Sequence, residues 1–235
     1  MSTDFVRPPT AQEAVLSEVR RLLVTGELAP GAPVRQEALA ERLGVSRVPL
    51  REALKVLEGE GHVVYLPRRG YSVAELSVDD LVEVYRMREL LEAEAIRVAV
   101  PLLTASELVV LSAAADEVDE SGSHASTDLA SITAANRRFH FLLFDAARMP
   151  RLSRTLRQLW DATDVYRAVY FAAPANRSRV AHEHAALLAA LANSDVEAAV
   201  AAQAAHREHS VAAVRAALTG DASHEVGEGV GQPPT

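Results

Sequence analysis

The chain has 235 residues, no cysteine and a formal net charge of −8 at pH 7. Its length suits two domains of about 100–200 residues each, and the absence of cysteine excludes disulfides and thiolate metal ligands. The sequence contains no apolar run of the ~18 residues that a membrane span needs, and residues 1–12 lack the apolar core of a signal peptide. We therefore expect a soluble, cytoplasmic protein. Its low aromatic content and abundant Ala, Leu, Glu and Arg favour helices.

The negative charge is confined to the second part of the chain. Residues 1–76 contain ten Lys/Arg and ten Asp/Glu, whereas residues 77–235 contain 14 basic and 22 acidic residues. A nucleic-acid binder needs only a local basic surface to meet phosphates. The acidic total therefore does not exclude DNA binding by the first part.

The first part predicts short helices followed by a β-hairpin. The expected elements are, in chain order, a flexible arm (1–10), three helices (11–25, 36–43 and 46–60) and a hairpin with strands Val63–Leu66 and Tyr71–Val73. Gly44 stops the second helix, and Ser46 is placed to cap the third. This arrangement predicts an N-terminal winged helix-turn-helix domain over residues 11–76.

The second part has helical periodicity throughout. We expect helices near 79–99, 105–119, 126–147, 150–171, 176–192 and 195–218, with a loop at 119–126. Residues 77–219 would then form an all-helical bundle of about six helices. Residues 220–235 have almost nothing to bury, which predicts a disordered tail. The fold class is mostly α with one small β-hairpin wing.

The two helices around Gly44 have the helix-turn-helix pattern, in which the second helix enters the major groove. That helix buries a leucine stripe and presents Arg47 and Arg51 on its other face, where Arg can read guanine. The hairpin tip is basic and is followed by Gly70, where the backbone can approach DNA closely. A single such arginine would be ordinary surface charge, but the combined pattern favours DNA binding. The candidate DNA-binding residues are Arg35, Arg42, Ser46, Arg47, Arg51, Arg68, Arg69 and Gly70.

Polar residues interrupt the apolar stripes of four helices in the second part. They are Arg88, Asn136, His140, His184 and His206. Burying an unpaired polar group costs about 1–3 kcal/mol, so these groups need to partner one another or share a ligand. Three imidazoles and one oxygen suit a divalent ion such as Zn²⁺, Ni²⁺ or Mn²⁺ in the interior of a helix bundle. The alternative is that each histidine is a hydrogen-bonded core residue, but three histidines on separate stripes favour a shared site.

Arg88 has two interpretations that the sequence does not separate. A guanidinium binds a carboxylate in a bidentate fork, so Arg88 could hold an anionic effector beside Asn136, His140, His184 and His206. It could equally form a structural ion pair, for instance with Glu92, which lies four residues later.

Several stretches resemble a known family of regulators. The stretches PGAPV, LAERLGVSRVPLREAL, EGEGHV and PRRGYSV resemble the winged-helix domain of the GntR family over residues 11–75. The resemblance implies that Arg47, Arg51 and Gly70 contact DNA. Residues 77–219 resemble the FadR-type ligand-binding domain (the FCD class).

The FadR-type resemblance also implies a metal site. Metal-binding members show Asp-x-x-x-His and then one His on each of two later helices. That order matches NRRFH, HEHAALLAAL and AAQAAH at His140, His184 and His206. Asn136 stands where Asp is usual, and an amide oxygen brings no charge, so we expect weaker metal binding. Some relatives bind an organic effector without metal.

Three functions remain open at the level of sequence. The leading one is a ligand-responsive transcription regulator that binds a pseudo-palindromic operator in double-stranded DNA as a homodimer and responds to a small carboxylate effector. A direct divalent-metal sensor is the second. A metal-dependent hydrolase is the third, because open three-histidine sites activate water. The hydrolase has no obvious general base and no use for a DNA-reading module, so we expect no enzymatic activity.

Overall fold

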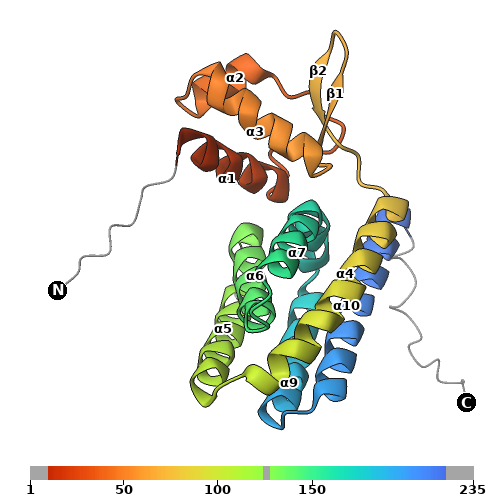
Figure 1. The fold of residues 1–235 in the computed structure, drawn as a ribbon. Helices are drawn as coiled ribbons and strands as arrows, with labels where there is room; N and C mark the ends of the chain where they lie inside the picture. Colours follow the sequence, from red (N-terminus) through yellow and green to blue (C-terminus); the bar gives the residue numbers. More distant parts are fainter. Residues whose placement is uncertain (1–9, 124–127, 221–235) are drawn as a thin grey trace, which may run out of the picture.

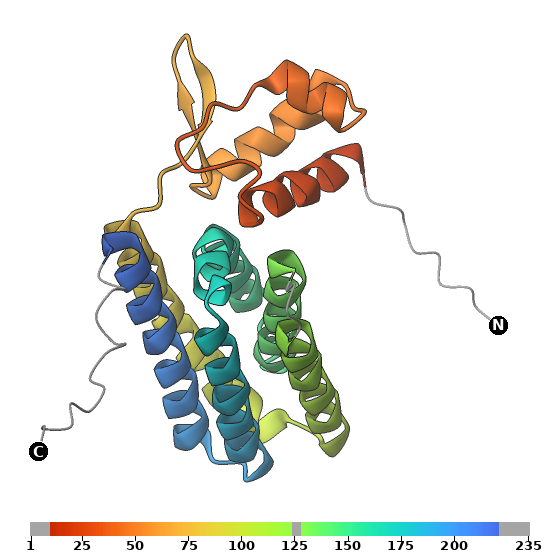
Figure 2. The same ribbon diagram turned by 180° about the vertical axis from the view of Figure 1, so that it is seen from behind.

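The computed structural model describes residues 10–123 and 128–220, which form a small N-terminal unit seated on one end of a helical bundle (Figure 1; Figure 2). Each unit has its own apolar core. The expected arm and tail lie outside the described residues, apart from Thr10 and Gly220. None of the described helices combines the length and apolar character needed to cross a membrane.

The N-terminal unit consists of three helices and a hairpin: α1 (Ala11–Val24), α2 (Gln36–Arg42), α3 (Arg47–Gly59), β1 (Val63–Leu66) and β2 (Gly70–Val73). A capping box between Thr10 and Glu13 begins α1. Gly44 turns the chain between α2 and α3 with a φ of +66°, which only glycine adopts at little cost. The winged helix-turn-helix architecture predicted from the sequence is confirmed.

The wing is an antiparallel hairpin that points away from the bundle (Figure 1). Val63 pairs with Val73 and Leu66 with Gly70, so the strands match the predicted ones to within one residue. The segment before α2 adds a short edge to this sheet, because Val34 N–H donates to the Tyr71 carbonyl at 2.8 Å.

Over residues 78–123 and 128–219, the bundle contains seven α-helices and one short 3₁₀ turn (Val100–Leu102). The helices are α4 (Val78–Ala99), α5 (Ala105–Ser123), α6 (Leu129–Asp145), α7 (Pro150–Ala162), α8 (Asp164–Ala172), α9 (Pro174–Ala192) and α10 (Val196–Thr219). The long α4 packs on α10, α10 packs on α9, and α5 packs on both α6 and α9. Their buried faces surround one apolar core.

Two expected boundaries in the bundle were wrong. The single helix expected over 150–171 is two helices that meet at Thr163, so the bundle has seven helices where about six were expected. The loop expected from residue 119 is helical as far as Ser123. Gly122 is tolerated in this helix because α5 lies close to α6 there, and a Cβ on Gly122 would come within 3.0 Å of Ile132 Cδ1.

A buried carboxylate lies at the centre of the bundle. Glu92 of α4 is fully buried and accepts four hydrogen bonds, one from its own helix and three from two other helices, α7 and α10. The donors are Arg88 Nε at 2.8 Å, Trp160 Nε1 at 2.8 Å, Gln203 Nε2 at 2.9 Å and Arg207 Nη1 at 3.3 Å. Burial raises the pKa of the Glu92 carboxyl, but Arg88 and Arg207 outweigh burial and hold that pKa below its ordinary value. The carboxylate is therefore ionised at pH 7 and joins α4, α7 and α10.

The Glu92→Gln variant should be strongly destabilised, because it leaves two buried guanidiniums without their counter-charge. We expect a loss of about 3–5 kcal/mol in the free energy of unfolding, measured by urea denaturation. Glu89→Gln is the matched control, since Glu89 pairs with Arg86 on the exposed face of the same helix. Its loss should stay within about 1 kcal/mol. Equal losses in the two variants would contradict a special role for Glu92.

Candidate functional site

The predicted DNA-reading residues lie on the surface of the N-terminal unit. Arg47 and Arg51, on the first turns of α3, have side chains that are 72% and 60% exposed. Arg35 immediately precedes α2, Arg42 is its last residue, and Ser46 immediately precedes α3. Arg68 and Arg69 form the hairpin tip, and all five residues are exposed. Gly70 begins β2 with a φ of +83°, a conformation that disfavours any other residue.

The arginines near the turn have only exposed acidic partners. Arg47 pairs with Glu37 at 2.7 Å, and Arg42 pairs with Glu27. Such exposed ion pairs contribute at most about 1 kcal/mol, so phosphate or a base can replace them at little cost. Ser46 holds the N-cap position of α3 but makes no capping hydrogen bond in the structure.

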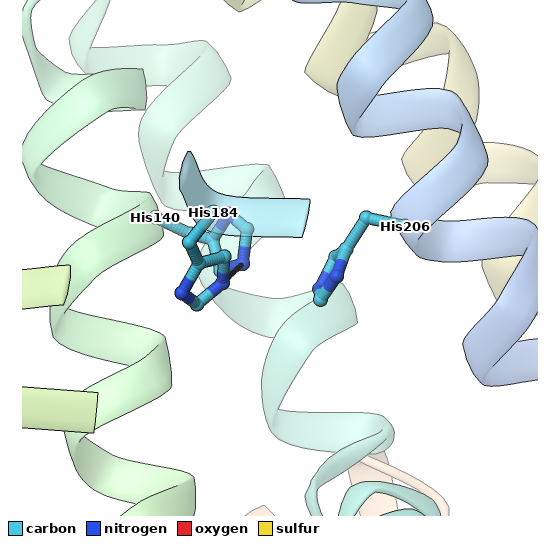
Figure 3. A group of neighbouring side chains, drawn as sticks. All are labelled: His140, His184 and His206. Carbon is cyan, nitrogen blue, oxygen red and sulfur yellow. Dashed lines mark hydrogen bonds between the residues drawn. The ribbon is translucent and has the colours of Figure 1, made fainter. Parts of the chain in front are cut away.

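The three predicted histidines meet in the interior of the bundle. His140 comes from α6, His184 from α9 and His206 from α10, and their rings turn towards one another (Figure 3). One nitrogen from each lies within 4.8 Å of the others, and the Nε2 atoms of His140 and His184 are 3.3 Å apart. Two ligands of one tetrahedral zinc, each at ~2.0–2.1 Å, are about 3.4 Å apart. The spacing of this pair therefore fits a shared divalent ion.

Several buried polar atoms around the histidines have no hydrogen-bond partner. They include Asn136 Oδ1, His140 Nδ1 and His184 Nδ1. Asn136 is 2% exposed and lies one helical turn before His140, so both side chains leave the same face of α6. Buried polar atoms are nearly always satisfied in folded proteins, so an unpartnered amide oxygen one helical turn from His140 indicates a missing ligand. The residues present fit a divalent cation with one oxygen and three nitrogen donors.

The protonation of the histidines also suits a metal. Burial lowers the pKa of His140 and His184 well below the ordinary value, and His206 lowers both further. Both rings are therefore neutral at pH 7, which is the form that coordinates metal. His206 Nδ1 lies 2.6 Å from Glu183 Oε2, which leaves its Nε2 available. Glu183 also contacts the exposed His209, with Nδ1 to Oε1 at 2.6 Å.

Arg88 is engaged within the protein. Its Nε donates to Glu92, its Nη1 donates to Thr163 Oγ1 at 3.0 Å, and its guanidinium lies 4.1 Å from the centre of a Trp160 ring. This geometry matches the structural ion pair with Glu92 that the sequence left open. Whether Arg88 also holds an effector stays a prediction. The Trp160 ring is 5.1 Å from the His140 ring, so the Glu92 network adjoins the histidines.

Sequence reasoning missed several residues of this interior. They are Trp160, Thr163, Glu183, Gln203 as a donor to Glu92, and Arg207. Glu92 was considered only as a partner of Arg88, although its position on the apolar stripe of α4 was a signal that it is buried. Nothing in the sequence pattern pointed to Glu183, because only the packing of α9 against α10 brings it close to His206.

Comparison with known families divides the chain at the same place as the fold. Residues 11–73 match the family of bacterial regulatory proteins called the gntR family, and residues 83–209 match the FCD domain. The second match covers more than half of the chain.

Individual relatives span both domains. The chain is 28% identical to the HTH-type transcriptional regulator YdhC of Bacillus subtilis (strain 168) over 82% of this chain and 86% of that protein. It is 32% identical to the HTH-type transcriptional regulator McbR of Escherichia coli (strain K12) over 62% of this chain and 65% of that protein. The solved structure of E. coli McbR/YncC is similar, with a TM-score of 0.78 and 27% identity, over 90% of this chain and 100% of that one. The chain therefore belongs to the GntR family of bacterial transcriptional regulators, carries an FCD effector-binding domain, and is not an enzyme.

Proposed function

We propose that this regulator belongs to the FadR subfamily, binds a pseudo-palindromic operator as a homodimer, and is controlled by a small carboxylate that meets a divalent metal inside the bundle. The main support for the metal is that His140, His184 and His206 meet in the interior and that the oxygen of Asn136, one helical turn from His140, is buried without a partner. The main support for DNA binding is the exposed basic surface formed by α3 and the hairpin tip.

DNA reading fits the chemistry of the exposed surface. The N-terminal end of α3 carries two exposed arginines, and Arg is the commonest reader of guanine in the major groove. The hairpin stands beside α3 with a basic tip, where a wing can reach the adjacent minor groove. Two such units need half-sites about one DNA turn apart, which is why we expect a homodimer and a pseudo-palindrome.

The metal fits the donor set and its surroundings. Neutral imidazoles and an amide oxygen suit Zn²⁺, Ni²⁺ or Mn²⁺. A bound ion would supply an electrophile able to hold a carboxylate oxygen. Since Asn136 adds no negative charge, the site would keep the full positive charge of the ion, which favours an anionic ligand.

The buried charge around the site also favours an anion. Arg88, Arg167 and Arg207 are all buried, whereas Glu92 is the buried carboxylate that faces two of them. Asp164 pairs with Arg167 from a partly buried position. Among the buried charged residues that the structure describes, guanidiniums therefore outnumber carboxylates by three to one, and Asp164 and Glu183 offset this charge only from partly buried positions. A small carboxylate would be attracted to the buried guanidiniums. Such a ligand changes DNA affinity only if it binds the DNA-competent and incompetent states unequally.

A direct metal sensor is the second candidate function. It is favoured by the full engagement of Arg88 with Glu92 and Thr163, because the arginine then needs no organic acid as a partner. In that case operator affinity should follow metal concentration with no acid present.

Metal occupancy can be read from the native mass spectrum of protein purified without a chelator or a histidine tag. We expect the added mass of one metal ion per protomer, and its loss in the His140→Ala variant, because the alanine removes a central ligand. The same spectrum reports whether the protein is a dimer. A parent protein that stays bare after addition of Zn²⁺, Ni²⁺ and Mn²⁺ in turn would refute the metal site.

Glu183 should tighten metal binding by orienting His206. Residues that hydrogen-bond a metal-ligating imidazole typically contribute about 10–100-fold in affinity. We expect Glu183→Gln to weaken Zn²⁺ binding by that order, measured by competition with a chelating dye, and to alter the visible spectrum of the Co²⁺ form. His209→Gln removes the other partner of Glu183 and is the control, with little expected change. Similar losses in both variants would contradict the role.

Arg51 should contribute to specific DNA recognition. With a duplex selected from a random pool by the parent protein, Arg51→Ala should weaken binding by ~1–3 kcal/mol if Arg51 makes a bidentate base contact. Fluorescence anisotropy at fixed salt measures the change. Lys55→Ala, one turn further from the N-terminal end of α3, is the matched control and should lose less. Unchanged affinity of Arg51→Ala for the selected duplex would remove Arg51 from the readout.

A further inference from the structure

The α7–α8 turn, residues 161–164, comprises the last two residues of α7, Thr163 and the first residue of α8, and it contacts the DNA-binding unit through Asp161. One carboxylate oxygen of Asp161 lies 2.7 Å from Arg137 of α6, and the other lies 3.1 Å from Arg20 of α1. The carbonyl oxygen of the same residue accepts a hydrogen bond from His62 Nε2 at 2.6 Å. His62 is buried, and it follows the C-terminal end of the recognition helix α3 by three residues. The turn therefore touches both α1 and the segment that ends α3.

Two further contacts strengthen this attachment. Arg20 also binds Glu60, the C-cap residue of α3, at 2.6 Å. Val165, in the first turn of α8, packs against the apolar core of the DNA-binding unit. The attachment thus combines part-buried ion pairs, a buried hydrogen bond and apolar contact, which together hold the end of α3 against the bundle.

The inner side of the same turn faces the interior of the bundle. Thr163 is fully buried, and its hydroxyl accepts hydrogen bonds from Arg88 Nη1 at 3.0 Å and Arg167 Nη2 at 3.1 Å. Arg88 in turn holds Glu92, and Glu92 accepts from Trp160, whose ring adjoins His140. Only one residue of the chain separates the inner contact at Thr163 from the outer contact at Asp161.

We infer that the α7–α8 turn, residues 161–164, transmits the state of the interior site to the recognition helix. This inference rests on the proposed function of the bundle as a ligand sensor, and it specifies the route of regulation. A ligand that moves Trp160 or draws Arg88 away changes the hydrogen bonds that hold the Thr163 hydroxyl. Because Asp161 is fixed to α1 and to the end of α3, a shift of the turn changes how the DNA-binding unit sits on the bundle.

The route can be tested in the full-length chain by hydrogen–deuterium exchange and mass spectrometry. Thr163→Val removes the hydroxyl on the inner side while keeping the shape of the side chain, and Thr163→Ser keeps the hydroxyl as its matched control. Asp161→Asn weakens the outer ion pairs. Asp145→Asn is the control for the outer change, because Asp145 pairs with Arg157 between α6 and α7 within the bundle.

We expect the Thr163→Val substitution, on the inner side of the turn, to affect hydrogen exchange at the end of α3 and in β1. Thr163→Val and Asp161→Asn should both speed exchange in residues 56–66 on the order of tenfold, while Thr163→Ser and Asp145→Asn leave that segment like the parent. The inference is overturned if Thr163→Val changes exchange only inside the bundle, or if Asp161→Asn leaves residues 56–66 unchanged.

A second hydrogen-exchange experiment uses Zn²⁺ alone as the probe. In the parent protein, Zn²⁺ should change exchange both near the three histidines and in residues 56–66, and Asp161→Asn should confine the change to the bundle. A change that reaches residues 56–66 equally in Asp161→Asn would overturn the route. If Zn²⁺ changes nothing in any segment, the metal part of the proposed function fails, and the Thr163→Val comparison still decides the inference.

Discussion

The requirement that a buried carboxylate be neutralised organises the interior of the bundle. Glu92 lies at the centre, and four donors from α4, α7 and α10 converge on it. An ionised carboxylate in an apolar core is costly unless it is paired and hydrogen-bonded, so these helices must meet in one arrangement. That arrangement places the Trp160 ring against His140, so the network that supports the fold also supports one side of the histidine site.

The same network joins the two domains without forming part of the covalent linker between them. Arg88 hydrogen-bonds to both Glu92 and Thr163. Thr163 belongs to the α7–α8 turn, which Arg20 and His62 of the DNA-binding unit contact at Asp161. Rigid packing on both sides of a short turn makes a small displacement hard to absorb locally. This is the physical reason why the interior of the bundle and the end of α3 are expected to respond together.

The DNA-binding unit depends on a different balance of forces. Its core is apolar, and its predicted DNA-reading arginines are exposed, with Arg42 and Arg47 in exposed ion pairs. The acidic excess of the whole chain belongs to the residues after 76, so it does not cover the recognition surface. The bundle thus carries the buried polar groups that suit a sensor, and the N-terminal unit carries the solvated cations that suit a DNA reader.

The sequence by itself determined the winged helix-turn-helix, the helical bundle and the stripes that carry His140, His184 and His206, because periodicity and turn residues are local signals. Only the tertiary structure decided the break at Thr163, where the buried hydroxyl meets Arg88 and Arg167. It also decided the helical state of residues 119–123, where α5 packs against α6. The tertiary structure also assigned Arg88 to Glu92 and brought Glu183 to His206. Contacts between residues far apart in the chain produce no periodic pattern in the sequence. The four hydrogen bonds to Glu92 and the contacts of Asp161 with the DNA-binding unit could therefore be identified only from the packed structure.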